Sequence, residues 1–161
     1  MCGITACAGP ARENVVDTLL EDLRNLEYRG YDSSGIATPG EDTVSVVKRE
    51  GEIEELAKTL DVVKPSGSVG IGHTRWSTHG APSDANAHPH TDCDNRVAVV
   101  HNGIIENYTA LREELTDRGH TFTSETDTEV VPHLVREHLE DGRSVEAAFR
   151  AALDRLEGRF A

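Results

Sequence analysis

Apolar residues recur at every third or fourth position near the start of the chain and mark an amphipathic helix. The residues of this stripe are Val15, Val16, Leu19, Leu20, Leu23 and Leu26. Because residues three and four apart share one face of an α-helix, the spacing predicts a helix over residues 14–26 with one buried side. Similar patterns and stop signals predict further helices over residues 53–60, 107–118, 128–139 and 144–156.

Short apolar and β-branched runs between these helices predict strands. We expect them over residues 3–8, 35–38, 44–49, 68–74 and 96–101. Between the last two runs lies a stretch of about twenty residues, 75–95, that is rich in Gly, Pro, Ser, His and Asn. A connection of this length inside a compact domain is usually functional or disordered. Residues 158–161 look like the start of one more strand, so we expect the chain to be a fragment.

Cys2 directly follows the initiator Met1. Because residue two is small, removal of Met1 would leave a cysteine whose thiol and free α-amine sit on one residue. An α-amine has a reference pKa near 7.7–8.0, so at neutral pH part of it is unprotonated and can accept the thiol proton. Cys2 is therefore a candidate nucleophile. From its position alone, the alternative is a small apolar residue at the start of a strand.

The charge is strongly acidic, with 29 Asp and Glu residues against 16 Lys and Arg residues and a net charge of −13. Phosphates would be repelled, so nucleic-acid binding is not expected. The acid is dispersed and only three basic residues are Lys, which is typical of a halophilic protein; the alternative is an ordinary acidic cytoplasmic protein. No signal peptide or membrane-spanning run is present in the sequence, and we expect a cytoplasmic location.

Four further segments place polar residues at the ends of apolar runs: 27–35 (EYRGYDSSG), 73–80 (HTRWSTHG), 101–107 (HNGIIEN) and 124–129 (SETDTE). Together with Met1-Cys2-Gly3-Ile4, they resemble the glutamine-hydrolysing half of the glutamine–fructose-6-phosphate aminotransferase family, a class II glutamine amidotransferase domain. Related amidotransferases typically have His-Arg-Gly where this chain has Tyr28-Arg29-Gly30. Ser77 stands where many family members have Ala.

The resemblance implies that Cys2 attacks the side-chain amide of glutamine and forms a γ-glutamyl thioester. Its own α-amine would take the thiol proton and later deliver one to the departing ammonia. The side-chain N–H of Asn102 and the backbone N–H of Gly103 would then form an oxyanion hole. On residue types alone, Asn-Gly is also a common tight turn.

Recognition of a free amino acid requires two opposite charges. The resemblance assigns Arg75 to the α-carboxylate, which its planar guanidinium can bind with two hydrogen bonds, and Asp127 to the α-ammonium. Asp127 could instead cap the helix that follows it. The resemblance also places Trp76, Thr78 and His79 in a loop that covers glutamine, although Trp76 could equally be a core anchor.

Several other residues have no role that chemistry alone assigns. Arg29, Tyr31 and Asp32 match the family signature and would brace the site or shape the interface with the synthase domain. His88, His90 and Cys93 lie within six residues and invite a zinc interpretation, but their spacing matches no standard site. We expect no metal and no cofactor. Cys7 is expected in the core and Cys93 in a loop.

The implied fold is α+β: the four-layer αββα sandwich of N-terminal-nucleophile hydrolases, C-terminally incomplete. We expect residues 1–161 to form a truncated glutaminase domain without the sugar isomerase domain, which would be its partner in a full-length homodimer that makes glucosamine 6-phosphate. Two alternatives remain: the glutaminase domain of another amidotransferase with a different acceptor, and an inactive glutamine-binding fragment.

Overall fold

A computed structural model describes residues 2–10, 14–77 and 80–161 of the chain. Four antiparallel strands form its main sheet in the order β1-β4-β2-β3. These strands are β1 (Gly3–Ala8), β2 (Ser33–Pro39), β3 (Val44–Glu50) and β4 (Val69–Arg75). In this register Gly3 faces Thr74, so the first residues of the chain lie beside the carboxyl end of β4.

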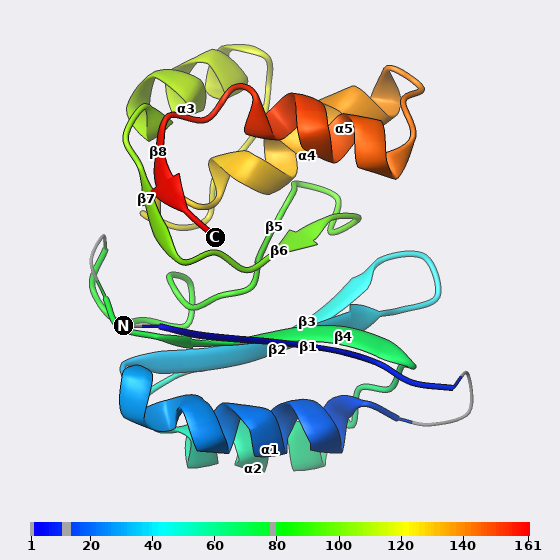
Figure 1. Ribbon diagram of the computed structural model, residues 1–161, viewed down its shortest axis with the longest axis vertical. Coiled ribbons are helices and arrows are strands. Elements are labelled where there is room, and N and C mark those ends of the chain that lie inside the picture. Colours follow the sequence, from blue (N-terminus) through cyan, green and yellow to red (C-terminus); the bar gives the residue numbers. More distant parts are fainter. Residues whose placement is uncertain (1, 11–13, 78–79) are drawn as a thin grey trace.

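Two helices, α1 (Val16–Leu26) and α2 (Ile53–Val63), cover one face of this sheet (Figure 1). Helix α1 begins where the Val16 N–H donates to Asn14 Oδ1 (3.3 Å), and α2 begins where the Ile53 N–H donates to Glu27 Oε1 (2.9 Å). The predicted apolar stripe of α1 packs into a core with these buried residues: Val15, Val16, Leu19, Leu23, Ile36, Val47, Ile53, Leu56 and Leu60. Cys7 is half-buried against this core.

The long connection after β4 packs on the opposite face of the sheet. A Cβ added to Gly35 in β2 would lie 2.3 Å from the His88 carbonyl oxygen, so the two backbones touch there and only glycine fits. Lys48 Nζ donates to the carbonyl oxygens of Ala85 (3.0 Å) and Ala87 (2.8 Å). Residues 85–88 of the connection therefore pack directly on the sheet, which supports the functional rather than the disordered interpretation of its length.

Short strands complete the second β layer. They form two pairs, β5 (His90–Thr91) with β6 (Ala98–Val99) and β7 (Gly103–Ile105) with β8 (Gly158–Phe160). The strand predicted over residues 96–101 is therefore reduced to two residues. The Asp92 carboxylate accepts the N–H groups of Arg96 and Val97, both at 2.7 Å, and so holds the start of that run in a turn.

Three helices form the outermost layer: α3 (Tyr108–Asp117), α4 (Val130–Glu140) and α5 (Val145–Leu153). They enclose a second core with these buried residues: Ile105, Leu111, Leu115, Val130, Val131, Leu134, Val135, Ala148 and Ala152. Figure 1 shows the resulting order of layers: helices α1 and α2, the main sheet, the short strands, and helices α3 to α5. The predicted helices and the four-layer α+β arrangement are confirmed. Among the described residues, no helix is long and apolar enough to cross a membrane.

Candidate active site

Cys2 lies at the edge of a pocket because β1 pairs with β4. Gly3 N–H donates to Thr74 Oγ1 (3.2 Å), which fixes the start of β1 against the end of β4. Directly after the end of β4, the Trp76 N–H donates to Cys2 Sγ (3.1 Å). The Cys2 side chain is half-buried, so the sulfur is held in place and still reachable from the pocket.

The side-chain amide of Asn102 contacts the backbone of Cys2. Asn102 Nδ2 donates to the Cys2 carbonyl oxygen (3.1 Å), and Asn102 Oδ1 lies 2.9 Å from His73 Nε2. His73 Nε2 also lies 3.1 Å from the His101 carbonyl oxygen. Both partners of Nε2 are acceptors, so this nitrogen carries the ring proton. Burial lowers the pKa of His73 to about 4, and the ring is neutral at physiological pH.

The N–H of Gly103 is directed away from the strand that pairs with it. Asn102 and Ala161 exchange both backbone hydrogen bonds (2.8 and 2.7 Å). The next facing pair, Gly103 and Phe160, is therefore of the type that shares no backbone hydrogen bonds. The N–H of Ile105 points the same way as that of Gly103, because direction alternates along a strand. The Ile105 N–H meets the pocket residue Asp127, so the Gly103 N–H also points away from β8, and the Asn102 side chain offers its N–H groups beside Cys2.

Position 103 accepts only glycine. Its φ is +129°, a region that L side chains rarely adopt. A Cβ at this position would lie 2.2 Å from the Arg159 carbonyl oxygen and 2.6 Å from Phe160 Cα. Gly103 therefore begins strand β7 and Asn102 directly precedes it, so the alternative of a tight turn is wrong.

Arg75 and Asp127 supply opposite charges to the same pocket, and both are almost fully buried. Arg75 Nη2 donates to the Gly80 carbonyl oxygen (3.2 Å), and Asp127 Oδ2 accepts the Ile105 N–H (2.8 Å). Burial lowers the pKa of Arg75, while the neighbouring carboxylates of Asp32 and Asp127 act in the opposite direction. Asp127 does not cap α4, whose N-cap is Glu129 without a side-chain cap bond; the capping alternative is wrong.

A buried carboxylate shapes the turn that carries Asp127. Glu129 accepts hydrogen bonds from the backbone and hydroxyl of both Thr123 and Ser124, at 2.6 to 2.9 Å. This closes residues 123–129 into a compact turn before α4. The charge of Glu129 is satisfied there, so Asp127 is the carboxylate of this segment that lines the pocket.

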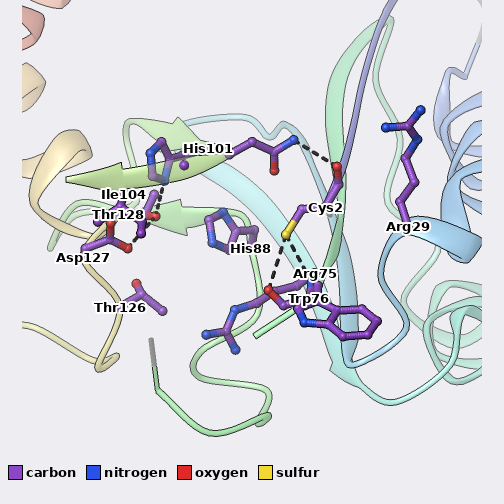
Figure 2. A pocket seen from close by; sticks show the side chains of 12 residues that line it. Cys2, Arg29, Arg75, Trp76, His88, His101, Ile104, Thr126, Asp127 and Thr128 are labelled. Carbon is purple, nitrogen blue, oxygen red and sulfur yellow. Dashed lines mark hydrogen bonds between the residues drawn. The ribbon is translucent and has the colours of Figure 1, made fainter. Parts of the chain in front are cut away.

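The pocket is a cavity of about 500 Å³. Its lining residues, whose side chains Figure 2 draws, are Cys2, Arg29, Arg75, Trp76, His88, His101, Asn102, Gly103, Ile104, Thr126, Asp127 and Thr128. The structure thus brings together six of the residues predicted from the sequence. Thr78 and His79, also predicted, lie outside the described residues.

Arg29, expected to brace the site or shape the interface with the synthase domain, also lines the pocket. Sequence reasoning gave no pocket role to the remaining lining residues: His88, His101, Ile104, Thr126 and Thr128. Most of these residues are next in sequence to a predicted site residue, and this adjacency is the signal that could have identified them. His101 Nδ1 lies 2.8 Å from Thr128 Oγ1, which joins the Asn102 and Asp127 segments. His88 had no such signal. It stacks on His73 with ring centroids 4.1 Å apart, and burial lowers its pKa well below the usual value.

The loop that follows β4 is braced by the segment before β2. Trp76 is 46% exposed, and the Tyr31 ring meets it edge-on at a centroid distance of 5.4 Å. The core-anchor alternative for Trp76 is therefore wrong. Asp32 Oδ2 accepts the Ser77 N–H (2.7 Å). Tyr31 and Asp32 thus contact the residues beside Cys2, whereas Arg29 itself lines the pocket.

His88 and His90 do not join Cys93. His88 belongs to the pocket, and His90 Nε2 lies 3.0 Å from Thr126 Oγ1. The zinc grouping considered from their spacing is therefore not formed. Cys93 lies elsewhere, near His120 and His133.

Comparisons with known proteins agree with this geometry. A family model described as a glutamine amidotransferase domain matches residues 73–161. Over its full 161 residues the chain is 53% identical to a glutamine–fructose-6-phosphate aminotransferase (isomerizing) of Pyrococcus horikoshii and 51% identical, over 161 residues, to that of Methanothermobacter thermautotrophicus. The chain covers 27% of each of these relatives.

A solved structure shares the fold. The glutamine phosphoribosylpyrophosphate amidotransferase from B. subtilis, complexed with ADP and GMP, matches with a TM-score of 0.79 at 25% sequence identity. The match covers 100% of this chain and 34% of that one. This chain of 161 residues thus spans only about a quarter to a third of the length of these relatives and of this structure.

Proposed function

The chain belongs to the glutamine amidotransferase family and has the fold of its class II, N-terminal-nucleophile members; we propose that it hydrolyses glutamine to glutamate and ammonia. One observation carries the proposal. The 500 Å³ cavity brings a reachable cysteine, two N–H groups and two opposite buried charges to one place. A free amino acid with a side-chain amide needs each of these features.

In this mechanism Met1 is removed and the α-amine of Cys2 becomes the general base. The amine takes the thiol proton as Sγ forms a bond to the side-chain carbonyl carbon of glutamine. The second N–H of Asn102 Nδ2 and the N–H of Gly103 stabilise the oxyanion. The C–N bond then breaks and the amine returns the proton to the departing ammonia. Water finally hydrolyses the γ-glutamyl thioester to glutamate and free Cys2.

Arg75 and Asp127 bind the ends of glutamine that do not react. Arg75 pairs with the α-carboxylate and Asp127 with the α-ammonium, and Trp76 covers the substrate together with Thr78 and His79. Both charged groups are buried, and a free amino acid supplies a binding partner to each of them, whereas a peptide-linked or des-amino amide supplies a partner to only one. This favours a free amino acid over a peptide-linked or des-amino amide.

The acceptor of the ammonia is a second part of the proposal. We infer that a sugar isomerase domain of a longer, dimeric protein uses it to convert fructose 6-phosphate to glucosamine 6-phosphate. The identity of 53% to a glutamine–fructose-6-phosphate aminotransferase, against 25% to the phosphoribosylpyrophosphate enzyme, supports this acceptor. An amidotransferase with a different acceptor is the second candidate, and the sequence beyond Ala161 distinguishes them.

The test is an intact-mass measurement after incubation with a glutamine-mimicking electrophile in high salt. We expect a species that lacks Met1 and carries one adduct, with labelling blocked by excess glutamine. Cys2→Ala should abolish labelling and glutamate release but keep glutamine binding, because attack and recognition use different residues. Cys7→Ser is the matched control and should label normally. Retention of Met1, or labelling of Cys2→Ala, would overturn the mechanism; glutamine binding without turnover would favour a non-catalytic binding module.

A further inference from the structure

We propose that Cys93, His120 and His133 form a zinc-binding site where the turn between β5 and β6 meets helix α4. The three residues come from separate parts of the chain: the turn between β5 and β6, the residue after Gly119, and the first half of α4. Their ligand atoms all lie within 4.8 Å of one another. Within the described residues, the hydrogen bonds and ring contacts of these three side chains involve only one another, Thr121, Phe122 and Glu137.

The distances between the ligand atoms fit a tetrahedral ion. Cys93 Sγ lies 3.7 Å from His133 Nδ1 and 3.9 Å from His120 Nδ1, and the two Nδ1 atoms are 3.1 Å apart. Zinc bonds of about 2.0 Å to nitrogen and about 2.3 Å to sulfur imply tetrahedron edges of about 3.3 Å for N–N and about 3.5 Å for N–S. The three separations therefore differ from these edges by at most about 0.4 Å.

The surroundings of His120 orient it as a ligand. His120 Nε2 lies 3.3 Å from Glu137 Oε1, and Glu137 Oε2 accepts Arg118 Nη1 (2.8 Å). A carboxylate that accepts the Nε2–H of a histidine leaves Nδ1 free to bind a metal, and this arrangement is usual behind zinc ligands. Glu137 also adds negative charge next to the cation.

Cys93 and His133 are suited to the same ion in different ways. Cys93 is exposed, and the Thr121 N–H donates to its sulfur (3.3 Å), an interaction that a thiolate accepts well. His133 is buried against the Phe122 ring, with centroids 4.6 Å apart. The thiolate and two imidazoles favour zinc over magnesium or calcium.

A bound ion would tie the β5–β6 turn to the outer helical layer. The same hairpin carries His90, whose Nε2 lies 3.0 Å from Thr126 Oγ1 at the pocket. The fourth position, on the side of the exposed Cys93, would be taken by water. Binding releases the thiol proton of Cys93 to solvent, so affinity rises with pH.

The test is titration of the reduced, metal-free protein with Co²⁺ and then Zn²⁺. We expect one equivalent of Co²⁺ to give a thiolate-to-cobalt charge-transfer band that one equivalent of Zn²⁺ removes. Free zinc at about 100 times the dissociation constant should raise Tm by roughly 5–10 °C. Because Cys93 is exposed, Cys93→Ser should fold normally, lose the band and lose the Tm shift.

Three variants serve as controls. Cys2→Ala and Cys7→Ser should both keep the band. Cys2→Ala removes the other possible chelate, an N-terminal thiol with its α-amine, so a band that persists in this variant comes from another site. His138→Gln, on the same helix as His133 but outside the cluster, should also keep it. Glu137→Gln should weaken binding by about 10- to 100-fold. A band that survives in Cys93→Ser, one that disappears in Cys2→Ala, or no band in any protein would overturn the proposal.

Discussion

His73 Nε2 on strand β4 lies 2.9 Å from Asn102 Oδ1. Because that nitrogen carries the ring proton, it selects which end of the Asn102 amide faces Cys2. Rotation of the amide by half a turn would place two N–H groups against the N–H of His73 and a carbonyl oxygen against the Cys2 carbonyl oxygen. The neutral, buried histidine therefore holds Nδ2 in the direction from which it can donate to an oxyanion.

Replacement of His73 by leucine should slow glutamine hydrolysis without removing any group that touches the substrate. We expect KM to change little and kcat to fall. The fall in kcat should be smaller than the roughly 10²- to 10³-fold loss that removal of an oxyanion donor causes. Asn102→Ala should show that full loss. His73→Gln, which can still donate to Asn102 Oδ1, should recover part of the rate. Steady-state kinetics decide this, and equal kcat values for the leucine and glutamine variants would contradict the positioning role.

Gly103→Ala should both destabilise the fold and abolish glutaminase activity. The Cβ would meet the Arg159 carbonyl oxygen at 2.2 Å, at a φ of +129°. A non-glycine residue held in such a region costs about 1–3 kcal/mol before the clash is counted. Gly142→Ala is the matched control, because φ is +82° there and nothing lies within 4 Å of the added Cβ. Urea unfolding should show a larger loss in the free energy of unfolding for Gly103→Ala than for Gly142→Ala. Equal losses would mean that strand β8 moves away from the added Cβ at little cost in free energy.

Asp127→Asn should weaken recognition of the α-ammonium and leave the backbone in place. The amide oxygen can still accept the Ile105 N–H, which Asp127 Oδ2 accepts at 2.8 Å. We expect kcat/KM for glutamine to fall roughly 10²-fold, as for loss of one partner of a buried charge pair. The readout is the ratio of kcat/KM for glutamine to that for its des-amino analogue, which should collapse in the variant. An unchanged ratio would remove Asp127 from this role.

Residues that chemistry requires could be predicted from the sequence, whereas residues that topology brings together could not. Cys2 and the Asn102–Gly103 pair stand out because few residue types can do their work, and the helical stripe of α1 stands out because its period is local. The relation of His73 to Asn102 depends on the register of β4 against segments far away in the chain. Sequence spacing carries no signal for it.

The same limit explains the other differences. Residues 96–101 look like a strand because they are mostly apolar. The Asp92 carboxylate accepts hydrogen bonds from the Arg96 and Val97 N–H groups, so these two residues form a turn and the strand is shorter than expected. The local grouping of Cys93 with the nearby histidines failed, because the cysteine meets His120 and His133 instead. Apolar content and proximity in sequence do not reveal which backbone groups a carboxylate will bind or which turn a helix will approach.

The dispersed negative charge should make the fold more stable in salt. The chain carries a net charge of −13, and screening of the repulsion between surface carboxylates favours the compact state. We expect Tm to rise from low salt to molar KCl. Differential scanning fluorimetry checks this directly, and a Tm that falls with KCl would contradict adaptation to high salt.

The buried histidines should make the protein sensitive to mild acid. Burial lowers the pKa of His73 from 6.5 to about 4, and the pKa values of His88 and His90 also lie well below the usual value. Between pH 6.5 and pH 4 the unfolded chain therefore binds protons that the folded chain does not, so the free energy of unfolding must fall as the pH falls. His73 alone accounts for about 3 kcal/mol over that range.

Urea unfolding in molar KCl, with a chelator present, isolates this effect. The salt screens the change in net charge, which would otherwise stabilise the fold as carboxylates become neutral, and the chelator removes any metal from His133. The urea midpoint should be constant near neutral pH and decline steadily from about pH 6.5 downward. His73→Gln should be less stable at pH 7 but lose less stability on acidification, because the glutamine cannot bind a proton in the unfolded chain. A midpoint that is flat or rises between pH 6.5 and pH 4.5 would mean that these rings are protonated in the fold.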